Sequence, residues 1–251
     1  MNWDTNQYLK FAEERKQPCL DLLARLEGPF ASVLDLGCGP GNSTGNIAAK
    51  FPSAQVMGLD PDENMLQKAK KEHPDLRFVQ GSAPADLPGL GQTFDLVFSN
   101  ACIHWIKEQE ELIRGVHAIL HENGVFAVQL PLTEQAPFHQ LVRRLAEEKW
   151  PQLRGVQSFH NLTAEGYYNA LSGLFGDVTL WQTNYYHVME KEMVIEWYKG
   201  SGLKPYLSAL AEDERTVFLQ ELQNAIHEEY PWLRDGKVAL LMPRLFFVAK
   251  K

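Results

Sequence analysis

The chain has 251 residues, of which 45% are hydrophobic and 22% charged, and its formal net charge at pH 7 is −8. This length suits one α/β domain with an appended helical cover, and the ordinary hydrophobic content predicts a globular fold throughout. A negative chain without a long cluster of lysine and arginine repels a polyphosphate backbone. Nucleic acid is thereby excluded as a partner, whereas a small anionic substrate held by a few arginines is permitted.

Three cysteines, Cys19, Cys38 and Cys102, lie far apart and show no Cys-x-x-Cys spacing. Neither a disulfide framework nor a metal site is indicated, so we expect a reducing, cytoplasmic location. The first residues lack a basic segment followed by an apolar one, and no apolar run approaches the ~18 to 20 residues of a spanning helix. We therefore expect no membrane contact, and a monomer, with a dimer as the alternative.

The first half of the chain alternates strands with helices. Between residues 7 and 26 apolar side chains recur at helical spacing, which predicts two short helices. Strands that are apolar on both faces and alternate with helices predict a mostly parallel sheet covered on both sides. The expected strands are 32–36, 55–60, 76–79, 94–99 and, after a turn at 122–124, 124–130; the expected helices are 43–50, 62–71 (capped by Asp62) and 108–120.

The pattern changes after Pro131. Two further strands are expected at sheet edges, and the segment of about 188–237 between them is predicted to form a helical lid. The fold class is therefore α/β, a Rossmann-like seven-stranded sheet with helices on both faces. The expected helices are 138–150, 164–174, 189–200, 205–210 and 213–230, and the expected strands are 178–187 and 238–248.

A glycine-rich turn follows the first strand and precedes a helix. Open α/β sheets bind nucleotides at this place. Gly37, Gly39 and Gly41 allow a sharp turn and close approach of a ligand, and the backbone N–H groups of the turn and helix are expected to hold an anionic tail. Asp60 ends the second strand about twenty residues further on, where a carboxylate accepts hydrogen bonds from both ribose hydroxyls.

The spacing of this turn distinguishes between cofactors. It reads Gly-x-Gly-x-Gly with Asp35 two residues upstream, whereas dinucleotide enzymes carry Gly-x-Gly-x-x-Gly. An acid at this place would repel a pyrophosphate but suits the ammonium of S-adenosylmethionine, on which Asp35 is expected to act through charge and bound water. The turn alone is equally consistent with a tight connection, but strand, helix and Asp60 together favour an S-adenosylmethionine site.

Polar and aromatic residues follow the fourth strand, at the sheet edge where cofactor and substrate should meet. Among them, His104 is a candidate general base, although a histidine beside Trp105 is more often a packed scaffold residue. Cys102 is expected to be a small buried filler.

Several segments of the chain are similar to those of known enzymes, namely 8–15 with Pro18, 35–44, 183–187, 202–207 and 243–249. Through them the chain resembles the class I S-adenosylmethionine-dependent methyltransferases and, over nearly its full length, the trans-aconitate methyltransferase family. This resemblance implies transfer of a methyl group to a carboxylate of trans-aconitate, which yields a monomethyl ester. Relatives usually have an acidic residue that binds the adenine amino group, and this chain has Ser82 there, which can accept the same hydrogen bond. His104 stands where a relative has glutamine, and 154–162 matches poorly.

The expected site follows from the motifs and the resemblance. Arginine grips carboxylates bidentately, and aromatic residues are expected as pocket walls. Residues 1–30 should form a helical cap, 31–131 the cofactor-binding core and 132–251 the substrate side, all within one structural domain. The expected cofactor residues are Asp35, Gly37, Cys38, Gly39, Gly41, Asn42, Asp60, Pro61, Met65, Ser82, Ala83, Asn100 and Trp105; the expected substrate residues are Tyr8, Arg15, Tyr185, Tyr186, His187 and Arg244.

The reaction itself needs little from the protein. A carboxylic acid with a pKa near ~4 is an anion at neutral pH, so no strong base is required. The chain must align the reacting groups, exclude water and neutralise the other carboxylates. The alternatives are a methyltransferase for another small or acyl-carrier-bound acid, an NAD-dependent oxidoreductase, and a non-catalytic cofactor-sensing module.

Overall fold

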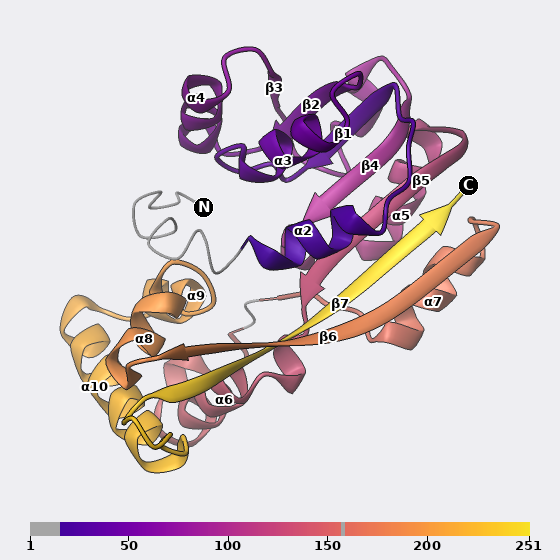
Figure 1. Cartoon of the computed structure of the whole chain (residues 1–251). Helices are drawn as coiled ribbons and strands as arrows, with labels where there is room; N and C mark the ends of the chain where they lie inside the picture. Colours follow the sequence, from indigo (N-terminus) through magenta and orange to yellow (C-terminus); the bar gives the residue numbers. More distant parts are fainter. Residues whose placement is uncertain (1–15, 157–158) are drawn as a thin grey trace.

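The computed structural model describes residues 16–156 and 159–251. Its seven-stranded sheet has the order β3-β2-β1-β4-β5-β7-β6 (Figure 1). The strands β1 to β5 are parallel, whereas β7 runs antiparallel to both β5 and β6. The expected mostly parallel sheet of seven strands is confirmed. Its strands are β1 (Ser32–Leu36), β2 (Gln55–Asp60), β3 (Arg77–Gln80), β4 (Phe94–Asn100), β5 (Leu120–Pro131), β6 (Asp177–Met189) and β7 (Val238–Lys250).

Two expectations about strands were wrong. Strand β7 is an inner strand, because it pairs with β5 on one side and β6 on the other. Chain order does not reveal strand order, and the last strand inserts between its two predecessors. In addition, β5 begins at Leu120, so the turn expected at 122–124 is an irregular part of the strand in which Asn123 has a φ of 63°.

The helices among the described residues lie close to their expected positions, whereas the first of the two helices expected between residues 7 and 26 falls outside the described residues. Asp62 caps α4, since its Oδ1 accepts hydrogen bonds from the N–H groups of Asn64 and Met65. Among the described residues, we find no helix with the length and apolar character needed to cross a bilayer. The helices are α2 (Gln17–Ala24), α3 (Asn42–Lys50), α4 (Glu63–Glu72), α5 (Gln109–Ile119), α6 (Pro137–Lys149), α7 (Ala164–Ser172), α8 (Lys191–Lys199), α9 (Lys204–Ser208) and α10 (Glu212–Glu229), with short 3-10 turns η1 (Leu87–Leu90), η2 (Ile103–Trp105), η3 (Thr133–Gln135) and η4 (Pro151–Leu153).

Helices cover both faces of the sheet. On one face α2 and α3 pack through side chains such as Leu22 and Ile47 against Val33 and Phe246. On the other face α5 and α7 pack against the remaining side chains of the same strands. Burial on both faces explains why the central parts of the inner parallel strands β1 and β4 are mostly apolar on both sides.

A separate helical unit stands beyond the end of the sheet. It consists of α6, η4, α8, α9 and α10, which pack together with the outer ends of β6 and β7 (Figure 1). The unit is larger than the expected lid of about 188–237, because α6 turns its apolar side chains toward α8 and α10. The long β6–β7 ribbon therefore joins the sheet to the helices.

Candidate active site

A cavity of about 630 Å³ opens at the carboxyl ends of the parallel strands. The last residues of β1, β2, β3 and β4, which are Leu36, Asp60, Gln80 and Asn100, all line it. Its volume falls in the range of small-molecule sites, and its position is the one at which open α/β sheets bind nucleotides.

Most of the expected cofactor residues line this cavity. Asp35 and Gly41 instead lie outside its wall. The expected residues in the wall are Gly37, Cys38, Gly39, Asn42, Asp60, Pro61, Met65, Ser82, Ala83, Asn100 and Trp105, and those that sequence reasoning missed include Lys16, Cys19, Ser43, Asn46, Glu63, Gln80 and Ile106.

The glycine turn has the strained geometry that its sequence predicts. Gly37, Gly39 and Gly41 have φ angles of +76°, +53° and +91°, which side-chain-bearing residues rarely adopt. A Cβ atom on Gly37 would lie 2.0 Å from Cys102 Sγ, whereas no atom lies within 4 Å of the corresponding position on Gly39. Packing against Cys102 thus requires a glycine at position 37. At position 39 the absence of a side chain keeps the adjoining part of the cavity open.

The turn's N–H groups are engaged within the protein, contrary to expectation. Gly37 and Cys38 donate to Leu59 O at 2.8 and 3.1 Å, and Gly39 donates to Asp60 Oδ2 at 2.9 Å. The N–H groups available to an anionic tail are those of the first turn of α3, which precede the bond from Gly45 to Gly41 O. The helix donors that the sequence predicts are therefore available, whereas the N–H groups of the turn itself are used within the protein.

Asp60 links the turn to the second strand. Besides the Gly39 N–H, its carboxylate accepts a hydrogen bond from Asp62 N at 2.9 Å, and burial raises its pKa above the usual value. A carboxylate has about four acceptor positions, so two bonds leave acceptors for the cavity that Asp60 lines. These acceptors fit the two hydroxyls of a ribose.

Asp35 lies beneath the turn and does not reach the cavity. It is fully buried, and its Oδ2 accepts hydrogen bonds from Ser43 and Thr44, each at 2.7 Å. Burial raises its pKa from 3.8 to about 6, although those two hydroxyls oppose the shift. Asp35 therefore makes no direct contact with the cavity, and an action through bound water stays a prediction. Asp35 orients the first turn of α3 and supplies charge from below.

Asn100 occupies the cavity wall at the end of β4. Its Oδ1 accepts a hydrogen bond of 2.7 Å from Gln129 Nε2, which fixes the side-chain amide with its NH₂ group available as a donor. At the opposite end, Ser82 N donates to Asp86 Oδ2 at 2.7 Å, which shapes the loop after β3. Polar groups therefore stand at both ends of the cavity.

The residues expected to bind the acid divide between several places. Tyr8 and Arg15 fall outside the residues that the structure describes. Tyr186 is 63% exposed, and neighbouring strand residues point to opposite faces, so Tyr186 cannot share one pocket wall with Tyr185 and His187. That expectation is wrong for Tyr186.

Tyr185 and His187 have packing partners. The Tyr185 hydroxyl donates to Asp21 Oδ2 at 2.6 Å, which ties β6 to α2, and burial raises its pKa so that it stays a donor. The His187 ring lies 4.9 Å from the ring of Trp197 in the helical unit. Both residues lie outside the wall of the cofactor cavity.

Arg244 is the buried cation of this region, with 9% of its surface exposed. It lies in β7 opposite Pro131, the last residue of β5, and opposite Thr183 of β6. This register brings Arg244 to the edge of the sheet at which the cofactor cavity opens. Its charge lowers the pKa of His104, where burial has the larger effect.

His104 lies beside the cavity in η2 and is only 3% exposed. Its pKa lies well below 6.5 because of burial, Arg244 and His139, so it is neutral and a weak proton acceptor. Its ring lies 5.1 Å from Trp105, which lines the cavity. The prediction of a general base therefore finds no support in this environment, and a carboxylate nucleophile has no proton to lose.

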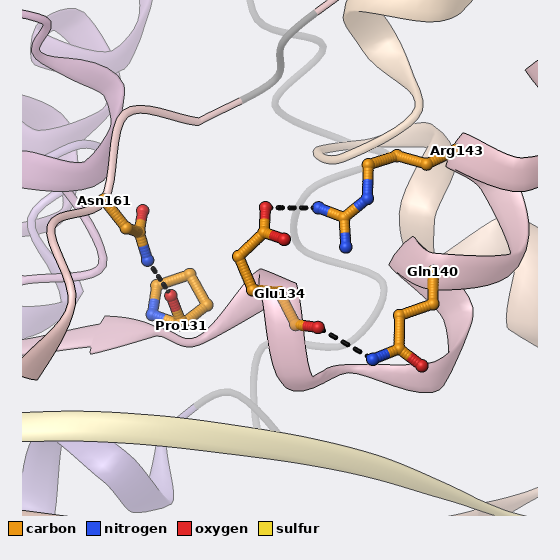
Figure 2. Close-up of polar contacts among 5 residues, drawn as sticks. All are labelled: Pro131, Glu134, Gln140, Arg143 and Asn161. Atoms are coloured by element: carbon orange, nitrogen blue, oxygen red, sulfur yellow. Dashed lines mark hydrogen bonds and ion pairs between the residues drawn. The ribbon is translucent and has the colours of Figure 1, made fainter. Parts of the chain in front are cut away.

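Two residues from the stretch before α7 that resembles the family poorly form hydrogen bonds to this region. His160 N donates to His104 O at 2.8 Å, and the Asn161 side chain donates to Pro131 O. Figure 2 shows this second contact beside Glu134, whose backbone oxygen accepts from Gln140 at 2.8 Å and whose carboxylate pairs with Arg143. The two contacts of Glu134 fix the path of the chain from β5 into α6. The bonds of His160 and Asn161 hold the segment before α7 against η2 and the end of β5.

Comparison with known sequences gives a family. Residues 33–124 match the model of a methyltransferase domain. The chain is 38% identical to the trans-aconitate 2-methyltransferase of Escherichia coli strain 55989 over 255 aligned residues, which cover all of this chain and 98% of the relative. It is also 38% identical to the enzyme of the same name from Azoarcus sp. strain BH72, with 98% of each chain covered.

Solved structures share the fold at low sequence identity. The YcgJ protein of Bacillus subtilis aligns with a TM-score of 0.60 at 15% identity, covering 95% of this chain and 98% of that one. Phosphoethanolamine N-methyltransferase 2 of Haemonchus contortus in complex with S-adenosyl-L-methionine aligns with a TM-score of 0.56 at 18% identity, covering 94% of this chain and 52% of that one.

Proposed function

The chain belongs to the trans-aconitate 2-methyltransferase family, and we propose that it transfers the methyl group of S-adenosylmethionine to a carboxylate of trans-aconitate, forming a monomethyl ester. The observation that carries this proposal is the full-length identity of 38% to a relative with that name. The chain is an S-adenosylmethionine-dependent methyltransferase of the α/β class. The proposal concerns its acid and the residues that bind it.

The residues around the cavity are proposed to hold the cofactor. Asp60 accepts the ribose hydroxyls, the first turn of α3 receives the methionyl carboxylate, and the loop at Ser82 contacts the adenine. Bound there, S-adenosylmethionine supplies an electrophilic methyl group on a sulfonium. The acidic residues near the turn, Asp35 and Asp60, suit its positive charge and would repel a pyrophosphate, which disfavours an NAD-dependent oxidoreductase.

The acid is proposed to bind between Trp105 and Arg244. The guanidinium of Arg244 is buried, and a buried cation attracts a carboxylate far more strongly than an exposed one. Trp105 lines the cofactor cavity, and its ring lies 5.1 Å from that of His104, whose pKa the charge of Arg244 lowers. These groups position an acid that is already ionised and exclude water from its carboxylate, which accelerates a displacement without a base.

One experiment tests the activity directly. The purified chain is mixed with S-adenosylmethionine and a panel of acids that includes trans-aconitate, and the products are identified by mass spectrometry. We expect trans-aconitate to gain one methyl group together with stoichiometric S-adenosylhomocysteine. If only another acid is esterified, that acid replaces trans-aconitate as the proposed substrate. Cofactor binding without turnover would indicate a sensing module.

A cytoplasmic location is part of the same proposal. All three cysteines are free thiols, and Cys19, Cys38 and Cys102 all line the cofactor cavity. Thiols at a functional site are compatible with a reducing compartment. Fractionation of cells that contain the protein would test the location.

A further inference from the structure

Two buried histidines stand beside Arg244, and neither contributes to the cofactor cavity. His104 comes from η2 after β4, and His139 comes from α6 in the helical unit; they are 3% and 8% exposed. Both rings pack against Phe159, with ring centroids 4.9 and 5.3 Å away. Trp105 also contacts Phe159, at 4.6 Å, so one aromatic cluster extends from the cofactor cavity to His139.

A buried polar atom in this cluster has no partner. Among the residues that the structure describes, His104 Nδ1 makes no hydrogen bond although it is shielded from solvent. Buried polar groups in folded proteins are almost always satisfied, and an exception calls for an explanation such as a functional role or a bound group. The Nδ1 atom of His104 can therefore form a hydrogen bond with a polar group of a ligand, because the described residues offer it no partner.

The electrostatics of the cluster complement an acid. Burial lowers the pKa of both histidines. The charge of Arg244 adds to this for His104, and the charges of Arg143 and then Arg244 add to it for His139, whose pKa falls to about 3. Each imidazole is therefore neutral and offers one N–H donor and one acceptor. Arg143 is engaged with Glu134 (Figure 2), so Arg244 supplies the charge and the histidines supply directed hydrogen bonds.

We propose that His104 and His139, together with Arg244, bind the carboxylates of the acid that do not receive the methyl group, and so restrict the substrate to polycarboxylates. This inference rests on the proposed function and extends it to residues outside the cofactor site. A site built to hydrogen-bond a group on the substrate rejects an analogue without that group, because its buried donors then lose their partners. A monocarboxylate cannot engage the cluster and the methyl donor at once.

Gly202 positions the second histidine. It lies between α8 and α9, and a Cβ atom added to it would lie 2.4 Å from His139 Cε1 and 3.3 Å from Nε2. No real Cβ contact is that short, so any side chain at 202 displaces the imidazole. The helical unit therefore sets the position of His139 through a residue that has no side chain.

The test compares hydrogen-bonding and apolar substitutions in the full chain. His104→Leu removes the polar ring, whereas His104→Asn keeps an N–H donor near the Nδ1 position. Calorimetric titration of trans-aconitate, with the protein saturated by S-adenosylhomocysteine, measures acid binding without turnover. We expect His104→Leu to weaken this binding by about tenfold or more, His104→Asn to restore most of it, and the affinity for S-adenosylhomocysteine to change less than about twofold.

Steady-state kinetics separate recognition from catalysis. In His104→Leu and Gly202→Ala the KM for trans-aconitate should rise by about tenfold with a smaller change in kcat. The inhibition constant of crotonate, a monocarboxylate, should change by less than about twofold. Gly202→Ala moves His139 without deleting it, so it serves as a second variant if the leucine variant fails to fold.

The outcomes distinguish this inference from the proposed function. An unchanged KM in both variants, equal weakening of trans-aconitate and crotonate, or no rescue by asparagine would overturn the roles of the histidines. Failure of the wild-type chain to make any ester of trans-aconitate would instead overturn the proposed function. Circular dichroism of each variant confirms that the comparison is made between folded proteins.

Discussion

The backbone N–H of Gly39 donates to the Oδ2 atom of Asp60 at 2.9 Å, across the 21 residues that separate them in sequence. The bond joins the glycine turn after β1 to the tip of β2. It fixes the carboxylate on one side and leaves its other acceptors to the cavity. The side chain that shapes the turn is therefore also the one proposed to recognise the cofactor.

Replacement of Asp60 by alanine should abolish cofactor binding while the chain remains folded. The variant loses the acceptors for two ribose hydroxyls, and hydrogen bonds to a charged group contribute about 1.5–3 kcal/mol each. We expect the affinity for S-adenosylmethionine to fall by at least about 100-fold in calorimetry. Asp75→Ala, which removes an exposed carboxylate from the loop before β3, is the matched control. Equal affinities for the two variants would refute the assignment.

Gly39→Val should have a similar effect for a different reason. Gly39 has a φ of +53° and lines the cavity, with open space where a Cβ atom would be. A valine strains the turn and places its methyl groups in the space of the cofactor. Thermal unfolding should still be cooperative, whereas calorimetry should detect no binding. Undiminished affinity would show that the cofactor does not pass this position.

Substitution of Arg244 should separate the two ligands. Arg244→Met keeps much of the side-chain volume but removes the charge, so we expect the KM for the acid to rise by about 100-fold, with cofactor affinity changing less than about twofold. Arg114→Met, which removes an exposed charge from α5, is the control. Equal losses for acid and cofactor would remove the proposed role of Arg244.

Asp35→Asn should change how stability depends on pH. The folded-state pKa of Asp35 is raised from 3.8 to about 6, so the folded chain holds the proton more tightly than the unfolded chain. Its contribution to stability is greatest below pH 4 and declines as the pH rises to about 6. Relative to wild type, the asparagine variant should therefore gain up to about 3 kcal/mol in its free energy of unfolding between pH 4 and 7.

Asp95→Asn is a control of opposite sign. Partial burial of Asp95 is outweighed by hydrogen bonds from Ser32 and Ala31, so its pKa is lowered. The stabilisation it provides is present at neutral pH and is lost as the pH falls through the folded-state pKa. Urea unfolding across this range should show the two variants diverging from wild type in opposite directions. If the stabilities of the two variants changed with pH in the same direction relative to wild type, the raised pKa of the buried Asp35 would be contradicted.

The hydroxyl of Tyr185 should matter for stability. Tyr185→Phe removes the bond to Asp21, which connects β6 to α2, and we expect the free energy of unfolding to fall by about 1–2 kcal/mol. Tyr186→Phe changes the same group on the exposed face and should have an effect within about 0.5 kcal/mol. Urea unfolding of the pair measures the difference, and equal stabilities would show that the bond to Asp21 contributes nothing.

The first half of the fold was predictable because its information is local. The apolar strand segments, the clustered glycines that later prove to have positive φ angles, and the Asp at the end of β2 can all be read along the chain. The full burial of Asp35 was not predictable, because a motif gives the order of residues but not the direction in which a side chain points. Strand alternation could have shown from the sequence that Tyr186 lies on the opposite face from Tyr185 and His187.

The parts of the site that escaped prediction come from distant segments. Cys19 of α2 and Lys16, which directly precedes that helix, enter the cavity wall without any motif, because their position depends on how α2 packs across the sheet. His139 lies in a helix that looks like ordinary amphipathic sequence, and only tertiary contacts bring it near Arg244. The insertion of β7 between β5 and β6 likewise follows from long-range pairing.

The β6–β7 ribbon is thirteen residues long in each strand and passes without a break from the sheet into the helical unit. A hinge between the two parts would have to bend a hydrogen-bonded ladder, which is stiff compared with a single-chain linker. Arg244 lies on that ladder. A tilt of the helical unit would therefore be transmitted along the ladder to Arg244, so the proposed acid site would move together with the helices.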